Sequence, residues 1–258
     1  MSIIYETFGD FNAGTFSYRL LLSKKTLGSI TLTDTNLSFE SQIDKVVFQI
    51  KLSDIQDFFL KYRLSIPLIE LITIHGTHYS LFPLRRKSTV FGSSLGMTED
   101  LFRHLSRLIF IKDQVVLFDA TGIFNPGSPK SISFKESSSK GHIFLTENNI
   151  LFRSFQQGGK DSISVSDIKQ IMMNAEGSTT YTTIETFKGD LFSFSILKAR
   201  RKKFRQDQFK TEKFYDILNQ VKMYKDSEKV GSLNITCSSC GNSIEKNMNH
   251  CPFCGNEI

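Results

Sequence analysis

The sequence predicts a mainly β fold of the α+β class: two tandem β units, each closed by a C-terminal helix, and a small cysteine-rich tail. Three observations predict this architecture. Residues 28–41 recur at residues 141–154, apolar and polar side chains alternate at the start of the first of these segments, and all four cysteines lie in residues 237–258.

The repeat has a constant offset of 113 residues, since 141 − 28 = 113. Residues 28–41 read GSITLTDTNLSFES, and residues 141–154 read GHIFLTENNILFRS. Further identical pairs keep this offset without a gap as far as Leu105 and Leu218. A long repeat of this kind indicates a duplicated structural unit. We therefore expect a first unit at 1–113, a second unit at 114–226, and a linker with a small metal-binding module at 227–258.

Alternation of side chains predicts the strands. Ile30 and Leu32 alternate with polar residues, which is the period of a half-buried strand. Asn36 suits the turn that follows, because asparagine tolerates a left-handed conformation. Further strands are expected at 46–52, 69–74 and 79–82 in the first unit, and at 162–165, 182–187 and 191–194 in the second.

Each unit ends in an expected amphipathic helix. Thr98 is the expected N-cap of the first helix, and Thr211 is expected to begin the second. The polar stretch 226–231 is interpreted as a linker to the tail. If the repeat register is right, four pairs should be buried alike: Leu32 with Leu145, Phe39 with Phe152, Ile55 with Ile168, and Leu105 with Leu218.

The repeated motif is G-x-I-x-L-T-x-x-x-L-x-F-x-S, followed by I-x-L-x-D-I and a C-terminal helix, and it resembles the GRAM and pleckstrin-homology-like family. The matching residues and their partners 113 positions later carry the resemblance: Gly28, Ile30, Leu32, Thr33, Leu37, Phe39, Ser41, Ile50, Leu52, Asp54 and Ile55. It implies a bent seven-stranded sandwich closed by a helix in each unit. It also implies lipid, peptide or ubiquitin-like partners, because this fold hosts binders of all three kinds.

The tail contains two C-x-x-C motifs, each followed by glycine, with ten residues between them. They supply Cys237, Cys240, Cys251 and Cys254. Four thiolates at this spacing predict one structural Zn²⁺ in a zinc ribbon, with no open position for catalysis. A redox dithiol pair is disfavoured, because no thioredoxin-like βαβ pattern surrounds the motifs. His250 is interpreted as a surface residue.

Basic residues gather before the expected helix of each unit. The second unit has six, and the first unit has three at the equivalent place: Lys198, Arg200, Arg201, Lys202, Lys203 and Arg205, and Arg85, Arg86 and Lys87. One interpretation is a solvated loop, since charge runs are common on surfaces. The other is a site for anionic lipid headgroups or for nucleic acid.

No pattern of catalytic residues emerges. Residues 92–96 match G-x-S-x-G, but that motif needs a strand, a helix and an α/β sheet around it. We expect a non-enzymatic cytoplasmic adaptor with no small-molecule substrate, since no secretory signal opens the sequence. Its expected partners are an anionic membrane surface, where it would be peripheral, or a protein. Nucleic-acid or chromatin binding is the alternative, which the net charge of +6 permits.

Overall fold

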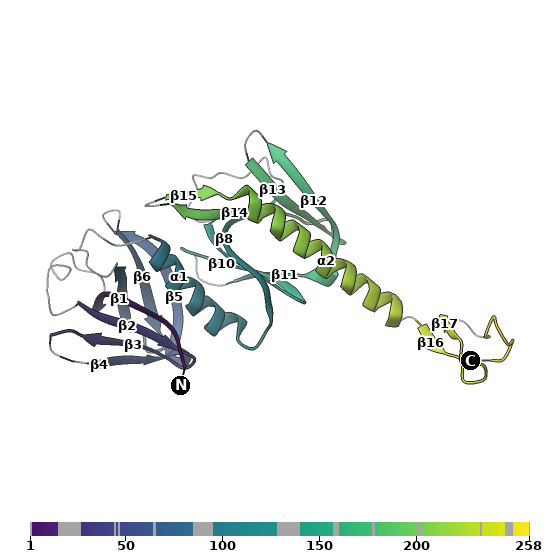
Figure 1. The fold of residues 1–258 in the computed structure, drawn as a ribbon, viewed down its shortest axis with the longest axis horizontal. Coiled ribbons are helices and arrows are strands. Elements are labelled where there is room, and N and C mark those ends of the chain that lie inside the picture. Colours follow the sequence, from purple (N-terminus) through teal and green to yellow (C-terminus); the bar gives the residue numbers. More distant parts are fainter. Residues whose placement is uncertain are drawn as a thin grey trace.

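The structure is a computed structural model that describes residues 2–14, 27–43, 45, 47–63, 66–84, 95–127, 140–156, 160–176, 179–200, 203–232, 234–245 and 250–257. Within these residues the chain forms a seven-stranded sheet, an eight-stranded sheet and a two-stranded sheet. The two large sheets are curled and antiparallel, and helices are few (Figure 1). This confirms the predicted mainly β, two-unit architecture.

The first unit is one sheet with the strand order β4-β3-β2-β1-β7-β6-β5. Its helix α1 (Leu95–Ser106) buries Leu101 and Leu105 in the core and continues as a π turn to Ile111. The strands are β1 (Ile3–Ala13), β2 (Leu27–Thr33), β3 (Asn36–Ser41), β4 (Val47–Lys51), β5 (Ile55–Arg63), β6 (Ile66–Thr73) and β7 (His78–Leu84).

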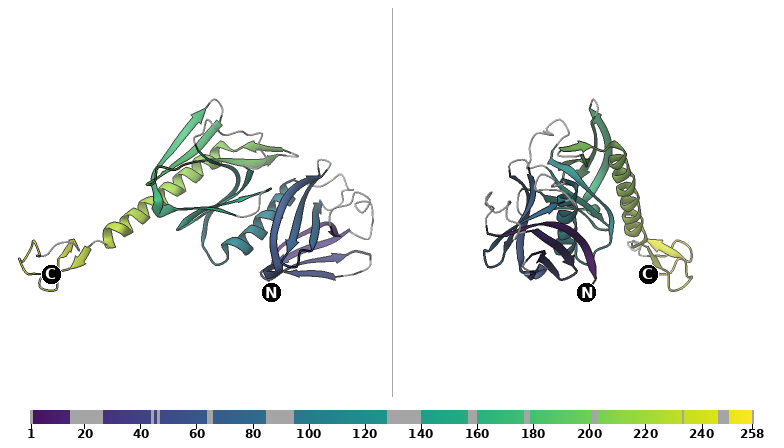
Figure 2. Two further views of the ribbon diagram at one scale, coloured as in Figure 1. Left: turned by 180° about the vertical axis from the view of Figure 1, so that it is seen from behind. Right: turned by 60° about the vertical axis from the view of Figure 1, so that its left-hand side comes forward.

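The second unit repeats this order as β11-β10-β9-β8-β14-β13-β12, with β15 paired to β14. Helix α2 (Gln208–Ser232) covers the sheet and projects past it to the tail strands β16 (Asn234–Thr236) and β17 (Ser243–Glu245) (Figures 1 and 2). The strands are β8 (Val116–Pro126), β9 (Lys140–Thr146), β10 (Asn149–Ser154), β11 (Asp161–Ser164), β12 (Ile168–Glu176), β13 (Thr179–Thr186), β14 (Leu191–Arg200) and β15 (Lys203–Gln206).

The repeat is kept in the strand register. Gly28 pairs with Ser41 between β2 and β3, and Gly141 pairs with Ser154 between β9 and β10. A Cβ atom at Gly28 would lie 2.0 Å from the carbonyl oxygen of Glu40, and one at Gly141 would meet the equivalent oxygen at 2.2 Å. Both positions therefore need glycine, because the neighbouring strand approaches too closely for a side chain.

All four pairs of predicted core residues are buried in both units. They are Leu32 with Leu145, Phe39 with Phe152, Ile55 with Ile168, and Leu105 with Leu218. Each unit has its own main hydrophobic cluster built around these positions. The register of 113 residues therefore describes the cores of both units.

The expected helix ends are wrong. Both Thr98 and Thr211 are buried inside their helices, which begin at Leu95 and Gln208. The Thr211 hydroxyl accepts the Ile196 N–H at 3.1 Å, so it completes a bond to strand β14. The stretch 226–231, expected as a linker, belongs to α2.

The two units are in direct contact. The edge strand β5 and helix α1 of the first unit face the second unit, where the chain leaves β10 (Figures 1 and 2). The Leu60 N–H donates to the Phe155 carbonyl oxygen at 2.8 Å. The Phe155 ring meets Phe102 of α1 edge-on at 5.0 Å and stacks on Phe204 of β15 at 5.6 Å. Phe155 thereby belongs to the core cluster of the first unit.

Among the described helices, none combines the length and apolar character that crossing a bilayer requires.

Candidate functional site

The four cysteines of the tail converge in space. Their Sγ atoms all lie within 4.8 Å of one another. The Cys237 and Cys254 sulfurs are 3.7 Å apart, and the Cys240 and Cys251 sulfurs are 3.6 Å apart. Four sulfurs at about 2.3 Å from a tetrahedral ion lie about 3.8 Å from one another. The donor set and its spacing therefore fit a metal ion such as zinc.

The two halves of the cluster have the same backbone geometry. Gly241 donates its N–H to the Cys237 carbonyl oxygen at 2.9 Å, and Gly255 donates to that of Cys251 at 2.8 Å. These glycines have φ angles of 74° and 76°, in the left-handed region. Glycine adopts this conformation without a steric penalty, which explains why it follows the second cysteine of each motif.

Backbone amides also favour the thiolate form that binds metals. The N–H groups of Cys240 and Ser239 lower the pKa of the Cys237 thiol to about 6. The Asn256 N–H acts in the same direction on Cys254, but burial and the three neighbouring sulfurs raise the pKa of that thiol to about 12, and a bound cation would remove this repulsion between thiolates. The Asn242 side chain donates to the Cys240 sulfur at 3.4 Å. His250 is exposed, pairs through its backbone with Glu257, and does not belong to the described metal-ligand group.

Four described residues of the basic run of the second unit, Lys198, Arg200, Lys203 and Arg205, lie on the two paired strands of a β-hairpin. Strands β14 and β15 form it, with Lys198 opposite Arg205 and Arg200 opposite Lys203 in the register. Lys198 and Arg205 are exposed, and they share a face because directly opposite residues point the same way. The Lys198 Nζ lies 3.8 Å from a carboxylate oxygen of Asp207.

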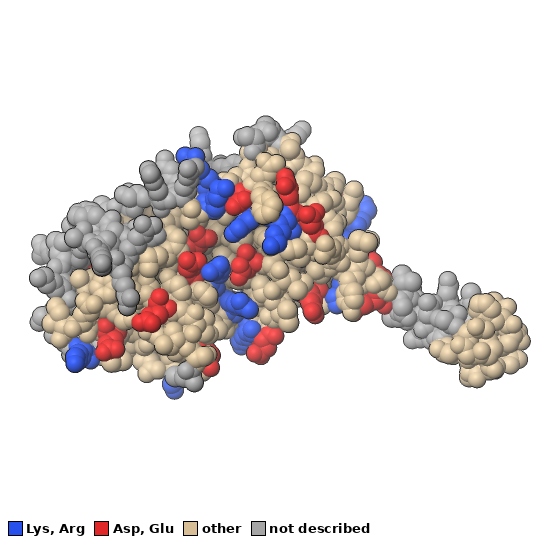
Figure 3. Space-filling model, viewed as in Figure 1, with Lys and Arg blue, Asp and Glu red and all other residues tan. Residues whose placement is uncertain are grey.

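The other face of this hairpin is apolar. Ala199 and Phe204 form the pair between the basic pairs, and both pack against the core cluster of the first unit. The hairpin is therefore anchored by one face and turns its basic face outward. On the side of the molecule shown in Figure 3, basic and acidic side chains of described residues are intermixed.

Several predicted site residues lie outside the described residues. They are Arg85, Arg86, Lys87, Arg201 and Lys202, and the side chains of Arg200 and Lys203. Of the G-x-S-x-G match, Gly92, Ser93 and Ser94 also lie outside the described part, and Leu95 and Gly96 begin α1.

The sequence analysis did not single out the residues by which the units recognise each other. His142 and Arg153 are buried at this contact. Ser29 and Glu40 occupy the equivalent positions in the first unit, where Glu40 is exposed. A signal for this contact was present in the sequence. The residue type changes between the two units at these positions, although the residues on either side of them are identical in both units.

Comparisons with known proteins give weak likenesses. No protein-family model and no curated protein matches the chain. Among solved structures, the C-terminal domain of an unknown protein from Leishmania infantum is similar, at 16% identity and a TM-score of 0.34, over 48% of this chain and 97% of that one. The Spt16D Pob3N heterodimer structure is similar at 12% identity and a TM-score of 0.31, over 73% of this chain and 88% of that one. At these scores neither likeness identifies the function of this chain.

Proposed function

We propose that this protein is a non-enzymatic cytoplasmic adaptor, peripheral at anionic membranes, with two GRAM or pleckstrin-homology-like units and a structural zinc ribbon. The observation that carries the proposal is the β14–β15 hairpin. Its apolar pair, Ala199 and Phe204, fixes it against the first unit, while Lys198 and Arg205 point outward. A rigid element that exposes basic side chains is suited to contact with anionic headgroups.

The expected affinity is modest. Each lysine or arginine near an anionic membrane contributes about 1 kcal/mol, so six contribute about 6 kcal/mol. This corresponds to a dissociation constant of order tens of micromolar. The acidic Asp207 close to Lys198 reduces the contribution of that lysine. Stable docking therefore requires a second contact, which the zinc ribbon or the first unit would provide by raising the effective concentration.

The zinc ribbon has a structural role in this proposal. Four thiolates complete the coordination of a tetrahedral zinc ion and leave no position for water or substrate. The ion would hold together a tail that is small and has few apolar residues. Helix α2 would set the distance between this module and the second unit.

The test is sedimentation with anionic and with neutral vesicles. The variant Arg200→Ala/Arg201→Ala/Lys202→Ala/Lys203→Ala should lose binding to anionic vesicles and keep its thermal stability, because exposed charges add little to folding. The variant Arg85→Ala/Arg86→Ala/Lys87→Ala should lose less. The matched control removes four exposed lysines elsewhere in the second unit: Lys160, Lys188, Lys210 and Lys213.

Equal losses in the hairpin variant and the lysine control would refute a specific role for the hairpin. Binding to DNA or RNA with a steep salt dependence, without binding to anionic vesicles, would favour the nucleic-acid alternative.

A further inference from the structure

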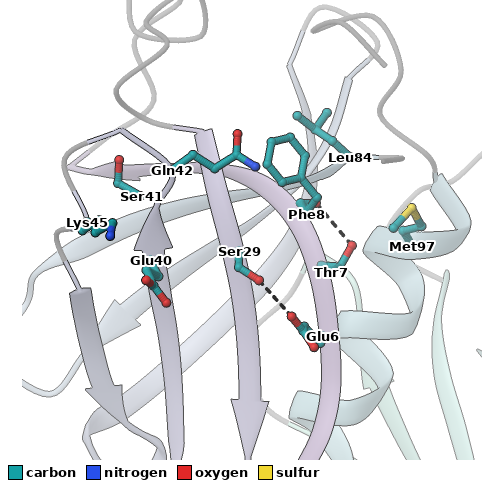
Figure 4. A pocket seen from close by; sticks show the side chains of 10 residues that line it. All are labelled: Glu6, Thr7, Phe8, Ser29, Glu40, Ser41, Gln42, Lys45, Leu84 and Met97. Atoms are coloured by element: carbon teal, nitrogen blue, oxygen red, sulfur yellow. Dashed lines mark hydrogen bonds between the residues drawn. The ribbon is translucent and has the colours of Figure 1, made fainter. Parts of the chain in front are cut away.

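The outer face of the first unit contains an open groove of about 830 Å³ (Figure 4). Its walls include Glu6, Phe8, Ser29, Glu40, Gln42 and Met97. The strand register aligns three of these residues in a row across β1, β2 and β3. Phe8 pairs with Ser29, and Ser29 pairs with Glu40. We call this surface the first-unit groove.

The same row in the second unit is covered. Thr121 pairs with His142, and His142 pairs with Arg153, each 113 residues after its counterpart in the groove. Helix α1 and strand β5 of the first unit lie on this row. The Thr121 hydroxyl donates to the Glu99 carboxylate of α1, and Arg153 forms an ion pair with Asp57 of β5.

The polar contacts of the covered row show which charges the elements bound to this surface carry. Arg103 of α1 lies 3.8 Å from the Asp119 carboxylate of the second unit. Asp119 is the counterpart of Glu6, and Arg153 is the counterpart of Glu40. Two charge pairs therefore hold the first unit on this surface. Arg103 of helix α1 lies opposite the acidic Asp119, and Asp57 of strand β5 lies opposite Arg153.

We propose that the first-unit groove is a docking site for an amphipathic helix of another protein, with a basic face. The groove has the strand register of the surface that receives α1, so a helix of similar size fits it. Phe8 and Met97 provide apolar contact area, and Glu6 and Glu40 are both exposed acids. Glu40 stands in the groove where the covered row has Arg153, and Glu6 stands where it has Asp119. Both positions are therefore acidic in the groove, and a helix with basic residues opposite them would be complementary in charge. Among the described residues that line the groove, Lys45 is the one basic residue and offsets one of the two acidic charges.

A second copy of this chain does not meet this requirement in a head-to-tail contact. The helix of the second unit that is equivalent to α1 is α2, and Asp216 stands where α1 has Arg103. In a head-to-tail contact Asp216 would face Glu6, and two like charges repel. Gln170 would replace Asp57 and bring no cation to Glu40. This arrangement also disfavours the open-ended polymer that repeated head-to-tail contacts would produce.

The probe is a labelled peptide of residues 95–111, held helical by a lactam bridge between core-facing positions. It carries Arg103, which would face Glu6 as it faces Asp119 in the covered row. Fluorescence anisotropy with the full-length protein should give saturable binding. Glu6→Lys should weaken this binding about tenfold or more, and an Arg103→Glu peptide should recover it on the Glu6→Lys protein. Glu147→Lys, a charge reversal at an exposed residue of the second unit, should leave the affinity unchanged.

Two results would overturn the proposal in this assay. One is no binding below about 1 mM, which is weaker than a docking site requires. The other is binding that Glu6→Lys does not weaken, because the peptide then contacts another surface. Sedimentation velocity gives a third result: self-association that Glu6→Lys abolishes would make a second copy the occupant and refute the heterologous helix.

Discussion

Arg153 is the residue whose replacement should separate the two units most directly. It is 2% exposed, and its guanidinium forms an ion pair with Asp57 and donates to the Phe58 carbonyl oxygen at 2.8 Å. The guanidinium also lies over two aromatic rings, at 5.2 Å from the centroid of Phe58 and 4.9 Å from that of Phe110. All these partners belong to the first unit, whereas Arg153 belongs to the second.

Replacing Arg153 by Met keeps most of the side-chain volume and removes the charge. Breaking a buried ion pair from one side costs about 3–5 kcal/mol. The Asp57 side chain is 23% exposed, so water can solvate part of its carboxylate and the loss should lie near the lower end, about 3 kcal/mol. For a protein of this size that lowers the melting temperature by about 6–12 °C.

The assay combines thermal unfolding, followed by circular dichroism, with amide hydrogen exchange. The Leu60 amide, which donates to the Phe155 carbonyl oxygen across the contact, should exchange faster in Arg153→Met. Adding Asp57→Asn should recover part of the stability, because no unpaired charge then remains. Glu40→Met is the matched control at the equivalent exposed position and should change stability by no more than about 0.5 kcal/mol. An unchanged melting temperature and unchanged Leu60 exchange in Arg153→Met would refute this account of the contact.

Two further predictions concern pH and metal. Burial lowers the pKa of His142 well below its ordinary value, and the charges of Arg103, Lys210 and His104 lower it further. Below the ordinary histidine pKa of about 6.5 the unfolded chain therefore binds a proton that the folded protein does not, so the free energy of unfolding should be about 1.4 kcal/mol lower at pH 5.5 than at pH 7.5. Denaturant titrations at these two pH values measure the difference, and a difference that persists in His142→Gln would assign it to another group. Structural zinc contributes about 10–16 kcal/mol in small modules, so a chelator should unfold the tail and leave both units folded. Elemental analysis that finds no zinc in freshly purified protein would contradict the metal assignment.

The sequence determined the features that depend on local pattern. Strand alternation, the amphipathic helix that ends each unit, and the paired C-x-x-C motifs each have a period or spacing that leaves few alternatives. The repeat added information that no single segment contains. Once Leu32 and Phe39 were assigned to a core, Leu145 and Phe152 had to occupy the same positions, and they do.

The sequence analysis did not predict strands β1, β5, β8, β12 and β15. In β1 and β8 the reason is that polar residues are buried in them. Thr7, Asp10 and Asn12 are all less than 9% exposed in β1, so the alternation that marks a half-buried strand is missing. The polar end of α2 was misread for a related reason. Lys225 pairs with Glu228 at 2.9 Å, and such pairs at helical spacing stabilise a helix that has few apolar residues to bury.

Only the tertiary structure decided which repeated positions are exposed in one unit and buried in the other. Glu40 and Arg153 have the same place in their strands, but Glu40 is exposed and Arg153 is buried against the first unit. Sequence pattern fixes the direction of a side chain relative to its own sheet. Burial also depends on what packs against that sheet, and α1 with β5 covers the second unit while the first-unit groove lies open.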